Sequence, residues 1–272
     1  MIATKDVITG IYRQEQSALG RQATHALRIT WDQNIMPGSF HDTWTSTYPL
    51  MRDIVMYHYR ASAASAAKFY RMLYSVEGRG VARVLSATPD MGKLDHVSDS
   101  VANGAFFHQL NKQQRTPGDA SLIARNTLSG AGSRFALSGG RDTIIGTTFI
   151  DTNVSGWERL TRPSACGFCI MHAVRGPFKP GMFDFHPHDY CSCVAVPLFR
   201  GDKSVNAWLA EEWRQATQGL TGKEARGAWE RYRGEDHGDD TTSGDGGGQT
   251  ASEGQGSGDV QSQWWGSALS DA

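Results

Sequence analysis

The chain has 272 residues, of which 39% are hydrophobic and 20% charged, so it can form one large or two modest domains with a buried core. No stretch approaches the roughly 18 consecutive apolar residues of a membrane-spanning helix. The first residues also lack the charged and apolar regions of a signal peptide. We therefore expect a protein of a reducing cytoplasm, where clustered cysteines more often bind metal or stay free than form disulfides.

The charge is unevenly distributed along the chain. The net charge is −1, but the residues from Gly234 onward include eight acidic side chains and no Lys or Arg. The segment 1–233 therefore has 27 basic and 20 acidic residues, a formal charge of +7. A basic body is compatible with a polyanion as a neighbour. Because no basic cluster stands out, an ordinary solvated surface is the simpler interpretation.

Apolar residues at steps of three and four predict a predominantly helical body over residues 1–138. The pattern predicts four helices, over residues 4–31, 41–76, 95–110 and 119–137. Asp119 is expected to cap the last of these, and its middle is weakened by Gly130 and Gly132.

Residues 139–233 have a different residue pattern, which predicts a small α+β module followed by C-terminal helices. The β-branched run 143–150 suits a strand, with a helical continuation as the alternative. The pattern further predicts strands at 156–161 and 190–197, a short helix at 166–174 and a helical stretch at 202–233. The fold class is therefore α+β, with a helical N-terminal body before the module.

The last segment, 234–272, predicts a disordered acidic tail. It has nine glycines between Gly234 and Gly258 and too little apolar surface to offset the entropy cost of ordering. The pair Trp264-Trp265 near the end either folds back on the body or anchors a partner.

All four cysteines lie within one short stretch that is also rich in histidine. Zinc prefers four thiolate or imidazole ligands in a tetrahedron. The spacing favours a set made of Cys166, Cys169, His188 and Cys191, with Cys193 or His186 as substitutes. On a strand, Cys191 and Cys193 would share a face but lie far apart unless the backbone turns. The alternative is that these side chains pack and hydrogen-bond without any metal.

Enzymatic motifs are not evident in the sequence. It has no phosphate-binding G-x-x-x-x-G-K-[ST], no His-Glu-x-x-His and no Gly-x-Ser-x-Gly. A catalytic cysteine with His172, His186 or His188 as its base would also need an orienting group and a cleft. We therefore expect no enzyme, although a Cys-dependent hydrolase is a distant alternative.

The residues from 156 to 199 form an ordered series. It consists of Gly156-Trp157-x-Arg159, Cys166-x-x-Cys169, Gly176, His188-x-x-Cys191-x-Cys193 and finally Pro197, which is expected to end the last strand. This series resembles the characteristic end of the MuF-like minor capsid proteins, the phage head-morphogenesis family, particularly those of actinobacterial tailed phages. Family members often have Arg between the last two cysteines, whereas this chain has Ser192.

The resemblance implies a structural protein with phage portal and capsid proteins as its partners. It places the protein in the virion, inside the head near the portal, and in the host cytoplasm during assembly. Packaged DNA would be contacted without sequence specificity, and neither a membrane nor a small-molecule substrate is implied. A zinc-knuckle nucleic-acid-binding protein is the alternative, because of the Cys/His spacing and the basic body.

Overall fold

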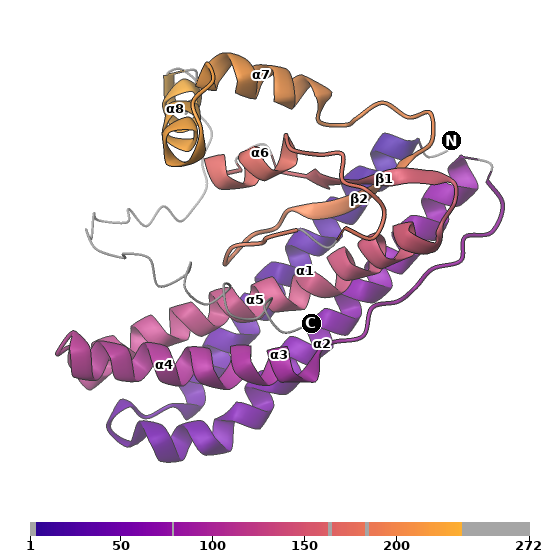
Figure 1. Cartoon of the computed structure of the whole chain (residues 1–272). Coiled ribbons are helices and arrows are strands. Elements are labelled where there is room, and N and C mark those ends of the chain that lie inside the picture. Colours follow the sequence, from indigo (N-terminus) through magenta and orange to yellow (C-terminus); the bar gives the residue numbers. More distant parts are fainter. Residues whose placement is uncertain (1–3, 78, 163–164, 183–184, 236–272) are drawn as a thin grey trace, which may run out of the picture. The chain divides into compact units, whose positions relative to one another are not determined.

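Three long helices form the main body of the protein. The computed structural model describes residues 4–77, 79–162, 165–182 and 185–235. Helices α1 (Lys5–Asn34), α2 (Phe40–Val76) and α5 (Pro117–Ile150) each contact the other two (Figure 1). A single 3-10 turn, η1 (Pro37–Ser39), connects α1 to α2.

The buried stripe of α1 explains why this segment is helical. At its start, the Thr4 hydroxyl accepts a hydrogen bond from the backbone N–H of Val7. The helices expected at 4–31 and 41–76 are confirmed, with ends that extend by a few residues. The buried residues of α1 recur at steps of three and four and are Ile8, Tyr12, Gln16, Gly20, Ala23, Leu27 and Trp31.

A glycine lets α2 and α5 approach at backbone distance. A methyl group on Gly139 would lie 2.1 Å from the backbone oxygen of Tyr59. Next to it, the Ser62 hydroxyl donates to Gln16 Oε1 at 2.6 Å and accepts from the Gly140 N–H at 2.9 Å. One residue from each of α1, α2 and α5 therefore takes part in a buried polar contact inside an otherwise apolar bundle.

The strand expected at 143–150 is wrong, because this run is the last part of α5. The hydroxyl of Thr143 accepts a hydrogen bond from Ala87 N–H, and that of Thr147 accepts one from Leu85 N–H. Both donors belong to an extended segment beside α5. These tertiary contacts override the β-branched preference for strands.

The domain division expected at residues 138 and 139 falls inside α5. The helix continues across these positions without interruption, and contacts group residues 1–234 into one compact unit. The helical body and the module therefore share a helix.

The segment 91–112 alternates between α-helical and π-helical pieces and packs against part of α5. Leu94, Val97 and Phe106 pack into the core between this segment and the long helices. The third expected helix is thus confirmed, with a start four residues earlier. The segment comprises α3 (Met91–Asp95), the π-helical η2 (His96–Ser100), α4 (Val101–Phe107) and the π-helical η3 (His108–Lys112).

The second half of the unit holds a two-stranded antiparallel sheet. Strand β1 (Val154–Leu160) pairs with β2 (Val194–Phe199). The short helix α6 (Gly167–Ala173) lies between the strands in sequence, as expected. Helices α7 (Ala207–Thr217) and α8 (Gly222–Glu235) follow β2 and together make up the helical stretch expected at 202–233.

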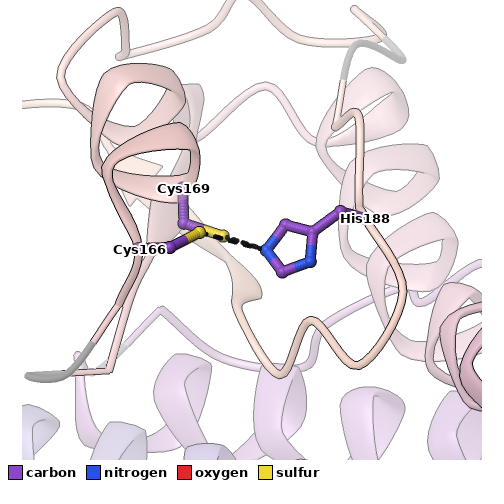
Figure 2. Close-up of side chains that lie close together, drawn as sticks. All are labelled: Cys166, Cys169 and His188. Carbon is purple, nitrogen blue, oxygen red and sulfur yellow. Dashed lines mark hydrogen bonds between the residues drawn. The ribbon is translucent and has the colours of Figure 1, made fainter. Parts of the chain in front are cut away.

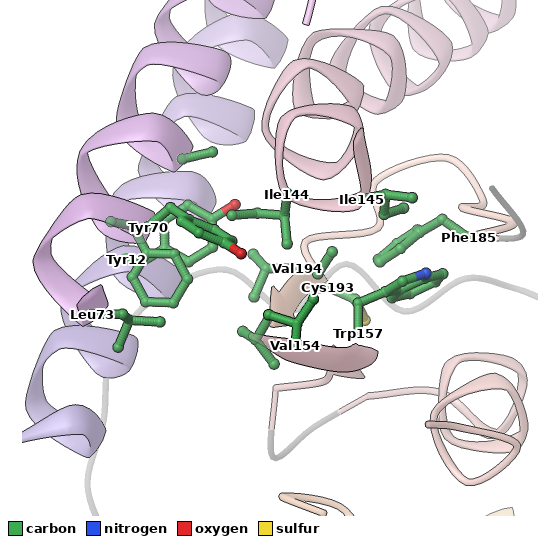
Figure 3. Close-up of a cluster of buried hydrophobic side chains, with 14 of the residues drawn as sticks. Tyr12, Tyr70, Leu73, Ile144, Ile145, Val154, Trp157, Phe185, Cys193 and Val194 are labelled. Atoms are coloured by element: carbon green, nitrogen blue, oxygen red, sulfur yellow. The ribbon is translucent and has the colours of Figure 1, made fainter. Parts of the chain in front are cut away.

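One apolar core joins the sheet to the long helices (Figure 3). Tyr12, Leu73 and Ile144 come from the helices, whereas Trp157 and Val194 come from the strands. The sheet thus packs on the long helices through side chains that come from the helices and from the strands.

Two sequence expectations concern membranes and the tail. None of the helices in the described part of the chain is both long enough and apolar enough to cross a bilayer. The predicted disordered tail, with Trp264-Trp265, lies outside the described residues except for its first two positions.

Candidate metal centre

Two cysteines of the centre come from the start of helix α6. Cys166 is the residue before the first helical position, and Cys169 lies in the first turn. Their spacing places both thiols on the same side of the helix end (Figure 2). Cys166 is exposed and Cys169 is buried. All four cysteines are free thiols.

His188 faces these two thiols from a loop. Its Nε2 atom lies 3.3 Å from Cys166 Sγ and 3.1 Å from Cys169 Sγ (Figure 2). The other ring nitrogen, Nδ1, lies 2.7 Å from the backbone oxygen of Asp189 and can donate its proton there. In this tautomer the lone pair of Nε2 points at the thiols, as in a histidine that binds a metal.

Cys191 and Cys193 complete a second group around Cys169. The Sγ atoms of Cys169 and Cys191 are 3.7 Å apart. Ligands of a tetrahedral zinc–thiolate site are separated by about 3.8 Å, given bond lengths of about 2.3 Å. The ligand atoms of Cys169, Cys191 and Cys193 all lie within 4.8 Å of one another, as do those of Cys166, Cys169 and His188.

The expectation that Cys191 and Cys193 would lie on a strand is wrong. Strand β2 begins only at Val194, so both cysteines precede it. Tyr190 has a left-handed backbone with φ of 59°, and this turn of the chain brings the two thiols together.

His186 is not brought into the cluster as a substitute ligand. Its backbone also has a positive φ, of 43°. Its imidazole belongs to neither group of ligand atoms and lies against the ring of His172.

The loop with His188, Cys191 and Cys193 is docked on α5. The Tyr190 hydroxyl donates to the backbone oxygen of Asn126, and its ring lies over Gly130, where a side chain would collide with it. One turn further along α5, Arg134 Nη1 forms an ion pair with Asp189 Oδ1 at 3.2 Å. The loop has little regular structure of its own, so these contacts position it.

Two buried arginines lie next to the sulfur cluster. Arg141 from α5 is 2% exposed and donates to the backbone oxygens of Cys191 and Cys193 at 2.6 and 3.1 Å. Arg159 from β1 is 1% exposed, and its Nη2 lies 3.7 Å from Cys191 Sγ. The ring of Phe185 has both guanidinium groups within 5 Å of its centroid, at 4.7 and 4.3 Å.

The arginines indicate that the cluster is negatively charged. The Nε and Nη1 atoms of Arg159 are buried and have no hydrogen-bond partner among the described residues. A buried cation is costly unless an opposite charge compensates it. Metal-bound thiolates would supply that charge, because a zinc ion with three thiolates and one imidazole carries a net −1. The residues present therefore fit a thiolate-rich metal site.

The pKa values of the thiols follow from the same contacts. Hydrogen bonds from the Cys169 thiol and then from His188, when its Nε2 carries a proton, lower the pKa of Cys166 to about 3. Hydrogen bonds from Cys169 and Cys193 lower the pKa of Cys191, and Arg141 and Arg159 lower it further. The pKa of Cys169 is raised because this thiol donates its proton to the neighbouring sulfurs, Cys166 first. A metal ion binding here would displace that proton.

The sequence predicts the cluster but not the arginines that support it. Spacing predicts Cys166, Cys169, His188 and Cys191, and the structure brings these residues near one another, with Cys193 beside them. Because an arginine is normally exposed, nothing in the local sequence indicates that both arginines next to the sulfurs are buried.

Comparison with known proteins identifies the family. Residues 1–218 match the family model described as "VG15 protein". No curated protein and no solved structure matches the chain. The match includes the long helices, the sheet and the whole Cys/His cluster. The chain therefore belongs to the VG15 family, a phage gene family, and is a phage protein.

Proposed function

We propose that the protein is a structural, non-enzymatic minor head protein of a tailed phage, which associates with the portal and the prohead interior. The observation that carries this proposal is a compact Cys/His centre, formed by the 156–199 series, in a chain of a phage family. That series resembles the MuF-like minor capsid proteins. The VG15 match supports the phage origin, and the resemblance supports the role in the head.

We further propose that the centre binds Zn²⁺. Thiolate and imidazole ligands suit zinc, and a closed set of four protein ligands is typical of a structural site rather than a catalytic one. The loop 185–193 has little regular structure of its own. One ion held by α6 and this loop would fix both segments to the sheet.

The proposal for the head is tested on purified phage particles. Mass spectrometry of the particles is expected to detect peptides of this chain, and co-expressed portal protein is expected to retain the full chain on a column. The chain's absence from the particles, with normal expression in infected cells, would contradict the proposal. A bait of unrelated phage tail protein is the control for non-specific retention.

The proposal for zinc is tested on the full chain purified under reducing conditions. Elemental analysis is expected to find zinc, and the Ser192→Ala variant, which changes only the residue between two cysteines, is expected to retain it. Absence of zinc from protein that remains folded, even after zinc is added, would contradict the metal centre. The role in the phage head would still stand in that case.

The pair Cys166 and His188 is also compatible with a thiol enzyme. The Cys166 thiol is exposed and lies 3.3 Å from an imidazole nitrogen. A nucleophilic cysteine would react with iodoacetamide much faster than the other three, before and after zinc is added. A permanent zinc ligand would react only after the metal has been removed, and an exposed thiol that only exchanges on and off the metal would react no faster than a free thiol. Labelling of Cys166 in the zinc-loaded protein much faster than that of a free exposed thiol would therefore favour the enzyme.

A further inference from the structure

The cluster holds more ligands than one tetrahedral ion requires. Four thiols and the Nε2 atom of His188 offer five donors, whereas a structural zinc site uses four. The donors form two groups of three, and Cys169 is the only described residue that belongs to both. Cys166 and His188 belong to one group, and Cys191 and Cys193 belong to the other. The Cys169 Sγ atom lies 3.1 Å from His188 Nε2 and 3.7 Å from Cys191 Sγ, so Cys169 links the two groups.

We propose that Cys166 and Cys193 are alternative ligands for the same position, and that Cys169, Cys191 and His188 are present in both arrangements. The inference rests on the proposed metal centre and concerns how that centre holds and releases its ion. In the first arrangement Cys166 completes the site, and in the second Cys193 replaces it.

Charge permits this exchange. Each arrangement has three thiolates and one imidazole, so the bound complex has a net charge of −1 in both cases. Arg141 donates to the backbone oxygens of both Cys191 and Cys193, and Arg159 contacts the Cys191 thiol. The buried positive charge therefore stays next to Cys191, which is a ligand in both arrangements, and neither arrangement leaves it without a partner.

Exposure distinguishes the two arrangements. Cys166 is exposed, whereas Cys193 is 3% exposed and packs in the core with Trp157 and Val194. The Cys166 arrangement has a ligand that solvent can reach, and the Cys193 arrangement encloses the ion. Exchange between these two thiols gives a route for the ion to enter and leave without unfolding of the sheet.

The test compares zinc content and affinity among variants of the full chain under reducing conditions. Cys166→Ser and Cys193→Ser are each expected to retain one ion, with affinity within about tenfold of the wild type. Cys169→Ser and the double variant Cys166→Ser/Cys193→Ser are expected to lose the ion. Ser192→Ala serves as the matched control.

Cobalt provides a second readout. Replacing zinc with Co²⁺ gives absorption bands that report tetrahedral geometry and the number of thiolates. The two single variants are expected to show the same three-thiolate spectrum as the wild type. Circular dichroism shows whether the helices of each variant are intact, so loss of metal is distinguished from loss of fold.

The outcomes separate this inference from the proposed metal centre. If the wild type binds zinc and either single variant loses it while still folded, the ligands are fixed and the exchange is wrong. Retention of zinc by the folded double variant would also overturn the exchange, because other ligands would then suffice. If the wild type binds neither zinc nor cobalt, the metal centre itself fails.

Discussion

The three long helices and the segment around the cysteines are stabilised by different forces. Helices α1, α2 and α5 bury wide apolar stripes against one another, and Gly139 brings the backbones of α2 and α5 together. The Cys/His segment has only two strands and one short helix among its described residues, and its loop is held by Arg141, Arg159 and the sulfur cluster. Buried area therefore stabilises the first region, whereas the second region shares an apolar core with the helices and depends in addition on directed polar contacts at its loop.

Removal of the proposed metal is the strongest test of this difference. On treatment with a chelator, amide exchange is expected to become fast in residues 154–199 and to stay slow in α2. Structural zinc contributes on the order of 10 kcal/mol to the folding of small domains, so the effect should be large. Readdition of Zn²⁺ should restore protection. Equal loss of protection in both regions would show that they unfold as one unit.

The Gly139→Ala variant perturbs the long helices alone. The new methyl group would meet the Tyr59 backbone oxygen at 2.1 Å, so the helices must separate. We expect a loss of about 3 kcal/mol in the free energy of unfolding, measured by denaturant titration, with zinc content unchanged. Gly146→Ala is the matched control on the same helix, because nothing lies within 4 Å of its added methyl group. That control should stabilise by about 0.5 kcal/mol.

Asp142 gives the long helices a pH dependence. Burial raises the pKa of its carboxyl group to about 6, against the opposing effects of Arg141, the Tyr59 hydroxyl and Lys93. The folded protein therefore keeps this proton when the unfolded chain has released it. This contribution to stability is full below about pH 4 and falls by about 3 kcal/mol as the pH rises through 6. Asp142→Asn should remove this part of the pH profile in a series of thermal melts.

The Arg159→Met variant tests the contribution of the buried cation to the proposed metal centre. Without the guanidinium near Cys191, the negative charge of the complex is less well compensated, and zinc affinity is expected to fall about tenfold. Competition with a chromophoric chelator measures this change. Arg175→Met is the control, because Arg175 is an exposed arginine shortly after the end of α6 and its loss removes the same charge from the surface. An unchanged affinity in Arg159→Met would mean that the buried cation does not support the site.

The long helices could be predicted from sequence because their signal is local. The buried stripe of α1 from Ile8 to Trp31 repeats at helical spacing, and the structure follows it. The run 143–150 could not be assigned in this way. Its β-branched residues favour a strand, and only the contacts of Thr143 and Thr147 with the neighbouring extended segment make a helix the better solution.

The candidate site was predictable in composition but not in geometry. Spacing alone grouped Cys166, Cys169, His188 and Cys191. The closeness of Cys191 and Cys193 depends on a left-handed turn one residue before Cys191 and on the late start of β2, and neither has a clear sequence signal. The burial of the arginines depends on residues far away in the chain, so no local pattern shows it.

The length of α5 has a mechanical consequence. Its 34 residues span about 50 Å at a rise of about 1.5 Å per residue. The loop with Cys191 is attached to this helix through Arg141, two residues from the point where Gly139 touches α2. A pull on the loop is therefore transmitted into a stiff rod that is braced against its neighbour, and little of the load is taken up by bending of the loop itself.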